Sequence, residues 1–138
     1  MKRFCTWRWL VALGVVVVTL SGCGGVGTLY PVSGKVTVDG QPLPDGQLSF
    51  VADAEKGNKT TVIPFAKIKD GSYSLTTKGK PGAPAGWYKI MVMTQYPGGP
   101  AKAVVLPRRY TDAGKSRLSV EVVPASQPGA YDLKLSSR

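Results

Sequence analysis

Residues 66–75 read AKIKDGSYSL, in which the dipeptide Asp70-Gly71 separates two short alternating runs. Asp-Gly favours a two-residue type I′ turn, because both central positions of that turn take positive φ angles. A turn at this point pairs Lys69 with Ser72 and fixes the register of the residues beyond them. Apolar side chains then meet on one face, and lysines meet hydroxyls on the other. The stretch predicts an antiparallel β-hairpin with one buried face.

The same alternation recurs on both sides of this hairpin, with Gly, Pro and Asp-Gly between the runs. Such period-two patterns are typical of half-buried strands. The expected strands are 32–38, 48–52, 66–69, 72–75, 87–96, 118–122 and 131–135, with 103–106 as a further short candidate. No segment from Tyr30 onward keeps a helical period. The pattern predicts an all-β fold, a single Greek-key β-sandwich of about seven strands.

The connections are predicted from the turn-forming residues. Asp39-Gly40 and Asp45-Gly46 are expected to bracket a tight connection, in which the prolines prevent further strand pairing. Residues 54–60 and 78–86 are expected to be loops, the first polar and the second rich in Pro and Gly. The segment 97–116 is too long to remain without structure in a small domain, so we expect it to pack on something.

Residues 1–22 have the layout of a secretory signal peptide. A basic head containing Lys2, Arg3 and Arg8 precedes the apolar stretch from Trp9 to Leu20, and small residues follow. The apolar stretch is shorter than the roughly 20 residues that a membrane-spanning helix needs. The N-terminal segment therefore predicts export of the chain.

Cys23 ends this segment in the sequence Leu-Ser-Gly-Cys, which resembles the lipobox of bacterial lipoproteins. There the thiol receives a diacylglycerol, and cleavage leaves the cysteine as the first mature residue. The alternative is an ordinary signal peptide followed by an incidental free thiol. If Cys23 belongs to a lipobox, residues 23–29 are a lipidated cysteine with a flexible tether, and residues 30–138 are the folded domain. Several acyl chains would make this anchor effectively permanent.

The location follows from the anchor. The domain would belong to the cell envelope, bound to a membrane and facing the periplasm or the exterior. Gly24 rather than Asp follows the cysteine, which favours an outer membrane where one exists. The chain has two cysteines, of which Cys5 leaves with the signal and Cys23 is blocked by lipid, so we expect no disulfide.

Five short motifs are spread over the domain. They are GKVTVDGQPL from Gly34, LSF from Leu48, DGSYSL from Asp70, GWYKIMV from Gly86 and PRRY from Pro107. Together they resemble the carboxypeptidase regulatory-like, or transthyretin-like (prealbumin-like), domain of small bacterial lipoproteins. The resemblance implies a seven-stranded sandwich that acts as an accessory or interaction module, usually without catalysis. Members that hydrolyse 5-hydroxyisourate rely on histidines and a C-terminal Tyr-Arg-Gly-Ser, whereas this chain ends Leu-Ser-Ser-Arg.

The composition narrows the possible chemistry. The chain has no histidine, which excludes Ser-His and Cys-His nucleophile pairs and removes the usual zinc ligands. Asp39, Asp45, Asp53 and Glu55 would suit calcium if they met, but Asp-Gly turns explain the first two better. We therefore expect no enzyme activity, no metal and no cofactor. The net charge of +10 would suit nucleic acid, yet an exported lipid-anchored domain rarely meets it, so we expect no nucleic-acid partner.

The first candidate binding surface is basic. Lys67 and Lys69 should project from the outer face of the hairpin, and Lys78 and Lys80 lie in the loop beyond it. These four side chains are candidate contacts for an anionic glycan or lipid headgroups. The alternative is an ordinary solvated basic face without a specific partner.

The second candidate surface lies on the expected strand 87–96. The resemblance directs alternate residues inward, namely Tyr88, Ile90 and Val92. The side chains left on the opposite face are Trp87, Lys89, Met91, Met93 and Gln95. That face is too apolar for open solvent. Either the segment 97–116 folds back and lays Val104, Val105 and Leu106 over the methionines, or Trp87, Met91 and Met93 form a partner surface.

Two functions of different classes follow. The first is a membrane-anchored, non-catalytic envelope lipoprotein that binds an envelope protein or an anionic glycan as an accessory module. The second is a structural spacer, a component of a larger envelope assembly that needs no small ligand.

Overall fold

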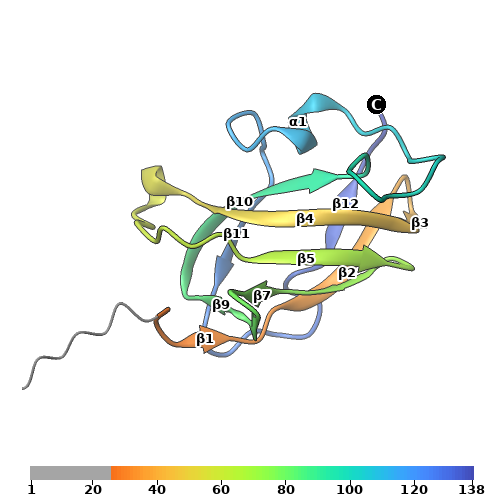
Figure 1. The fold of residues 1–138 in the computed structure, drawn as a ribbon. Coiled ribbons are helices and arrows are strands. Elements are labelled where there is room, and N and C mark those ends of the chain that lie inside the picture. Colours follow the sequence, from red (N-terminus) through yellow and green to blue (C-terminus); the bar gives the residue numbers. More distant parts are fainter. Residues whose placement is uncertain (1–25) are drawn as a thin grey trace, which may run out of the picture.

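The computed structural model describes residues 26–138, and they form an all-β domain (Figure 1). The prediction of the fold class is therefore confirmed. The strands are β1 (Leu29–Tyr30), β2 (Ser33–Val38), β3 (Gln41–Pro42), β4 (Asp45–Ala52), β5 (Phe65–Lys69), β6 (Ser72–Ser74), β7 (Thr76–Thr77), β8 (Lys80–Pro81), β9 (Ala83–Pro84), β10 (Gly86–Met93), β11 (Ser119–Val122) and β12 (Leu133–Leu135). A 3-10 turn, η1 (Ala54–Lys56), and a short helix, α1 (Arg108–Thr111), complete the described part.

Seven strands follow one another in a continuous hydrogen-bonded path, in the order β11-β10-β4-β5-β6-β2-β12. Neighbours in this path are antiparallel, except that β12 runs parallel to β2. In Figure 1 the path curls, so that β10, β4 and β5 lie in front of β2 and β12. The separation into two sheets of a Greek-key sandwich stays a prediction.

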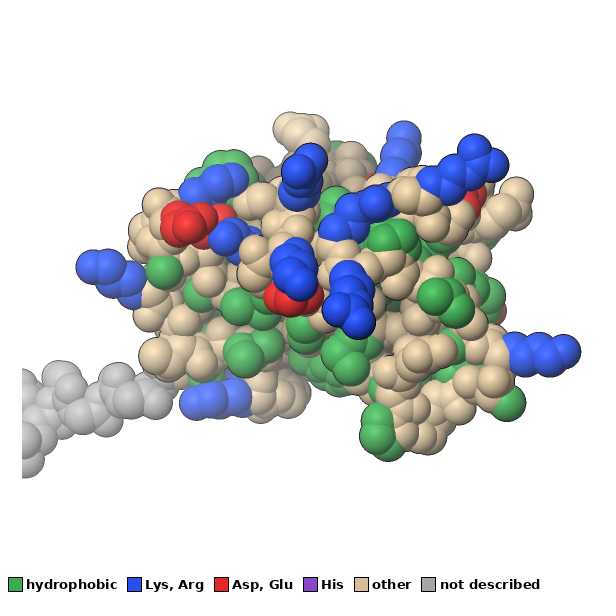
Figure 2. All heavy atoms as spheres, turned by 90° about the horizontal axis from the view of Figure 1, so that it is seen from above, with side chains coloured by type: hydrophobic (Ala, Val, Ile, Leu, Met, Phe, Trp, Pro, Cys, Tyr) green, Lys and Arg blue, Asp and Glu red, His purple; other side chains and the backbone are tan. Residues whose placement is uncertain are grey.

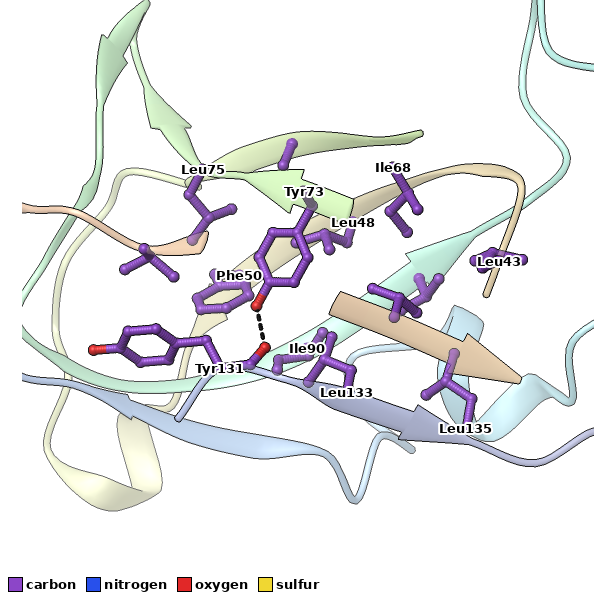
Figure 3. Packing of buried hydrophobic residues seen from close by; sticks show 14 of the residues in the cluster. Leu43, Leu48, Phe50, Ile68, Tyr73, Leu75, Ile90, Tyr131, Leu133 and Leu135 are labelled. Atoms are coloured by element: carbon purple, nitrogen blue, oxygen red, sulfur yellow. Dashed lines mark hydrogen bonds between the residues drawn. The ribbon is translucent and has the colours of Figure 1, made fainter. Parts of the chain in front are cut away.

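The core lies inside this curl. Figure 3 shows buried side chains from β4, β5, β6 and β10 directed toward those from the opposite strands. Phe50 and Tyr88 pack with their ring centroids 5.6 Å apart. The Tyr73 hydroxyl donates to the Tyr131 carbonyl oxygen at 2.5 Å, which satisfies both groups inside the core. Burial raises the pKa of Tyr73, because ionisation would place a charge in an apolar environment.

The hairpin of β5 and β6 forms as predicted. Asp70 and Gly71 have φ angles of +50° and +75°, as a type I′ turn requires. Lys69 pairs with Ser72, and the pairing of Phe65 with Thr76 keeps the same register through β7. The register set by the Asp70-Gly71 turn is therefore the same at Lys69–Ser72 and at Phe65–Thr76.

The connection between β2 and β4 differs from the prediction. Asp39-Gly40 makes the expected turn, but Pro42 lies in β3 and pairs with Thr37 of β2. The prediction that proline would prevent pairing is wrong, because the neighbouring Leu43 N–H donates instead, to the Val36 carbonyl oxygen at 3.0 Å. The proline occupies a position where the ladder needs no donor.

Asp45-Gly46 is not a turn, which corrects a second prediction. Asp45 pairs with Lys69 and Gly46 pairs with Ile68 inside the antiparallel ladder of β4 and β5. A Cβ atom on Gly46 would lie 3.1 Å from the carbonyl oxygen of Met93. The glycine is present because neighbouring atoms approach closely, and not because the backbone turns there.

The segment 78–86, which was expected to be a loop, contains β8, β9 and the first residue of β10. Lys78 and Gly79 have φ angles of +50° and +79° and connect β7 to β8. The following strand, β9, pairs with β1, in which Leu29 faces Pro84. Leu29 therefore belongs to the folded part of the chain, although the sequence pattern assigned it to the tether.

The segment 97–116 folds back onto the domain without forming the expected strand at 103–106. Leu106 and Tyr110 are each only 8% exposed and belong to the core cluster. The Tyr110 hydroxyl accepts a hydrogen bond from the Ser136 backbone N–H at 3.2 Å. Val105, one of three residues expected to lie over the methionines, shares a hollow with Met93 but is itself 74% exposed.

Candidate binding face of the sheet

The outward side chains of β10, β4 and β5 form one surface, which we call the outer face. Lys67 of β5 pairs with Gln47 of β4, and Gln47 pairs with Met93 of β10. In the next row, Phe65 pairs with Ser49, and Ser49 with Met91. The residues between these positions on each strand are buried, so the paired side chains point outward. The two candidate surfaces thus adjoin each other across β4.

The basic half of the outer face extends across β6 to β2. Lys69 pairs with Ser72, and Ser72 also pairs with Lys35 of β2. Lys67 and Lys69 line a shallow hollow between the strands. The other residues around it are Phe65, Ala66, Ser72, Tyr73, Ser74 and Thr76. Exposed ammonium groups therefore alternate with hydroxyls on this half, as the hairpin register predicted.

The apolar half is partly covered by the protein itself. Tyr88, Ile90 and Val92 are at most 1% exposed, which confirms that they point into the core. On the outer face, the Lys56 ammonium lies 4.0 Å from the centroid of the Trp87 ring. This cation–π contact shields one face of the indole.

Met91 and Met93 are half-buried. Met93 shares a hollow with Leu106 and Thr111, so the folded-back segment reaches the end of this strand. Met91 lies one row further from that end, opposite Ser49. The use of Trp87, Met91 and Met93 as a partner surface stays a prediction.

Lys89 lies within the apolar half and contacts two carboxylates. The sequence patterns did not connect these carboxylates with Lys89. Its Nζ donates to Glu55 Oε2 at 3.1 Å and lies 4.0 Å from Asp53 Oδ1. The hydrogen bond from Lys89 to Glu55 is the main cause that raises the pKa of Lys89. Asp53 is only 3% exposed, and its Oδ1 atom has no hydrogen-bond partner. The sequence pointed to Asp53 and Glu55 only as acidic residues close together in the chain, and to Lys89 only as a lysine between apolar residues.

Lys78 and Lys80 do not join Lys67 and Lys69 around one hollow. Lys78 lies in the β7–β8 turn, and it lines a separate hollow with Val26 and Pro84. The four lysines predicted as one group therefore divide. Lys67 and Lys69 lie on the outer face, Lys78 lies near the start of the described chain, and Lys80 pairs with Thr77 across the β7–β8 turn.

Of the acidic residues considered for calcium, only Asp53 and Glu55 lie near each other, at the Lys89 ammonium. Asp39 accepts hydrogen bonds from Ser137, which lower its pKa, and Asp45 accepts one from the Tyr96 hydroxyl. Within residues 26–138, no group of three or more acidic, cysteine or histidine side chains comes close enough to hold a metal ion. The expectation that the protein binds no metal comes from the sequence and stays a prediction.

Positive charge also extends beyond the outer face. Figure 2 views the molecule from the side of α1, where Lys and Arg side chains are spread widely and acidic ones are fewer. Charge alone therefore does not distinguish one surface of this protein. The combination that distinguishes the outer face is paired lysines and hydroxyls beside half-buried methionines.

The predicted lipid anchor, Cys23, lies outside the described residues, which begin at Val26. Within residues 26–138, no helix is both long enough and apolar enough to cross a membrane. Comparisons with protein-family models, with curated proteins and with solved structures found no match to this chain. The resemblance to the carboxypeptidase regulatory-like domain stays a prediction from the motifs.

Proposed function

We propose that this protein is a lipid-anchored, non-catalytic envelope module whose outer face binds an extended anionic glycan. The observation that carries the proposal is the row formed by Lys67, Gln47 and Met93 across three adjacent strands. It sets an ammonium group, an amide and an apolar side chain side by side at strand spacings of about 4.8 Å.

The chemistry of this row suits a charged sugar chain. Ammonium groups attract carboxylate or phosphate substituents, and amide and hydroxyl groups hydrogen-bond to sugar hydroxyls. Half-buried methionines offer polarizable surface to the apolar side of a sugar ring. Because β5 and β6 keep their lysines and hydroxyls exposed, these groups are hydrated and accessible to a ligand from solution.

The glycan proposal is tested by calorimetric titration of the purified lipoprotein with a soluble polyuronate and with a neutral glycan. We expect binding of the polyuronate only, with affinity that falls as salt rises. Lys67→Glu/Lys69→Glu should weaken binding about tenfold or more, since opposite charges then repel the ligand. A matched control is Lys102→Glu/Lys134→Glu, because both of these lysines are also exposed.

Two results would contradict the proposal. Equal losses in the two double variants would indicate nonspecific attraction to a basic protein. Absence of glycan binding, together with cross-linking from intact cells that recovers the chain only within a large protein assembly, would favour the structural spacer.

The anchor has its own test. Cys23→Ala should abolish acyl labelling and release the protein from the membrane fraction, because no other thiol lies at the end of the apolar run. Lipid label that persists on the variant would contradict the lipobox. Membrane association without label would indicate an uncleaved signal segment.

A further inference from the structure

The described chain begins at one end of the domain, next to elements that are distant in sequence. Val26 and Gly27 surround a hollow together with Lys78, Pro84 and the segment 60–62. Directly after them, β1 pairs with β9. Figure 1 shows β1, β7 and β9 together at this end of the molecule. The position of Val26 relative to the surrounding surface is therefore defined.

The distance from this point to the proposed anchor is short. Val26 follows Cys23 by three residues. A fully extended chain covers at most about 3.5 Å per residue, so the two positions can be separated by only about 10 Å. If Cys23 carries the lipid, the surface around Val26 must lie close to the headgroups.

That surface has the composition of a membrane-contact site. Ile63 directly follows the segment 60–62 and is 60% exposed, so its side chain is accessible to a bilayer at this end of the domain. Lys59 directly precedes this segment, Lys78 lines the hollow, and Lys80 follows the same tight turn as Lys78; all three are exposed. Phe65 pairs with Thr76, and Ile63 and Lys78 each lie two residues beyond that pair, so they extend toward the same end.

Neighbouring acidic groups do not neutralise these lysines. Glu55 and Asp53, which precede the segment 60–62 in the chain, are held by Lys89 at 3.1 Å and 4.0 Å. An exposed apolar side chain among uncompensated lysines matches a bilayer that carries anionic headgroups over hydrocarbon. A free glycan would provide no apolar phase for Ile63.

We infer that Lys59, Ile63, Lys78 and Lys80 form a membrane-docking edge that rests on anionic lipid headgroups. This inference depends on the lipid anchor of the proposed function. The docking edge converts a simple tether into an oriented attachment, because it adds contacts on one defined side of the domain. The hairpin face with Lys67 and Lys69 and the far end of β10 then remain accessible from the aqueous side.

The far end of the molecule supplies a matched control. β10 runs from Gly86, directly after β9, to Met93, a length of about 25 Å at ~3.3 Å per residue. Val105 shares a hollow with Met93 and is 74% exposed. Ile63 and Val105 are therefore two exposed apolar side chains, one near the tether and one far from it.

The test uses the full-length lipoprotein after maturation, reconstituted into vesicles. Cys5 is lost with the signal and Cys23 is lipidated, so Ile63→Cys and Val105→Cys each give one free thiol for a fluorophore. Lipids that carry a nitroxide quencher report proximity to the bilayer. In vesicles of phosphatidylcholine with phosphatidylglycerol, we expect severalfold stronger quenching at position 63 than at position 105.

Charge reversal tests the headgroup chemistry. Lys59→Glu/Lys78→Glu/Lys80→Glu should abolish the excess quenching at position 63 while the protein still floats with the vesicles. The matched reversal at Lys102, Lys115 and Lys134, which are also exposed, should leave the quenching unchanged. Pure phosphatidylcholine, or about 1 M salt, where the Debye length is about 3 Å, should have the same effect as reversal of the docking edge.

The outcomes separate the two proposals. If the protein floats but position 63 is quenched no more than position 105, the docking edge is wrong and the anchor stands. Quenching at position 63 that resists charge reversal and salt also overturns the docking edge. If the unmodified protein fails to float with vesicles, the anchor fails and the docking edge fails with it.

Discussion

The hairpin at residues 65–76 and the segment at residues 97–116 are organised by different kinds of contact. In the hairpin, the turn at Asp70-Gly71 and the pairs beside it define the register. In the longer segment, Tyr110 is held by Ser136, which is distant in sequence. The register of the first region is defined by its own turn, whereas the second region is held by the surface on which it packs.

The difference explains why an apolar run failed as a strand signal. Residues 103–106 read AVVL, a run with high strand propensity. A strand also needs a free edge, and β10 is already paired on both sides, with β4 and with β11. The segment therefore places Leu106 into the core as irregular structure and leaves Val105 in solvent.

The largest effect is expected where the segment enters the core. Leu106→Ala should destabilise the domain by about 2–4 kcal/mol, because it removes a buried side chain and leaves a cavity. Val105→Ala, its exposed neighbour, should change stability by no more than about 0.5 kcal/mol. Chemical denaturation of the two variants measures this contrast. Equal losses would mean that Leu106 does not anchor the segment.

One glycine in each region allows a direct comparison of how the two backbones tolerate an added side chain. Gly71 and Gly98 have φ angles of +75° and +80°. A Cβ on Gly71 would lie 2.6 Å from the Cβ of Pro42, whereas a Cβ on Gly98 would meet nothing within 4 Å. We expect Gly71→Ala to cost about 2–3 kcal/mol and Gly98→Ala about 1 kcal/mol, since only the first adds a clash to the strain. Similar melting temperatures would show that the hairpin tolerates movement of Pro42.

Tyrosines give the two regions opposite dependence on pH. Burial raises the pKa of Tyr73, so its contribution is present below the unfolded pKa of about 10 and is lost as the pH rises. The Arg109 guanidinium beside Tyr110 lowers the pKa of Tyr110, so its contribution is present above about 10 and is lost as the pH falls through the lowered value.

Two phenylalanine variants separate these contributions. Tyr73→Phe should cost about 1–2 kcal/mol at neutral pH by removing a buried hydrogen bond, and it should flatten the loss of stability above pH ~10. Tyr110→Phe should steepen that alkaline loss slightly. Denaturation curves at several pH values test both signs. Unchanged alkaline behaviour in Tyr73→Phe would exclude this tyrosine as the titrating group.

The smallest effect on stability is expected on the outer face of the hairpin. Lys67→Glu/Lys69→Glu should change the free energy of unfolding by no more than about 0.5 kcal/mol, because both ammonium groups are exposed to solvent. A large loss of stability would mean that these lysines hold the fold together, and the same variant could then not report on glycan binding.

The sequence by itself determined the elements whose pattern and turn chemistry agree. Asp70-Gly71 set the hairpin register, and alternation identified the buried faces of β2, β4 and β10. These predictions succeed because period-two alternation shows which residues share a face of a strand. Residues that favour positive φ angles show where the chain reverses. Neither signal depends on a partner elsewhere in the chain.

Only the tertiary structure decided which strands are neighbours. It made β12 parallel to β2, gave β9 a partner in β1, and set Lys67 and Met93 in one row through Gln47. It also moved Lys78 away from the hairpin lysines and beside Val26. Side-chain alternation is identical for every possible neighbour, so the choice among them depends on close approach and complementary packing between residues distant in sequence.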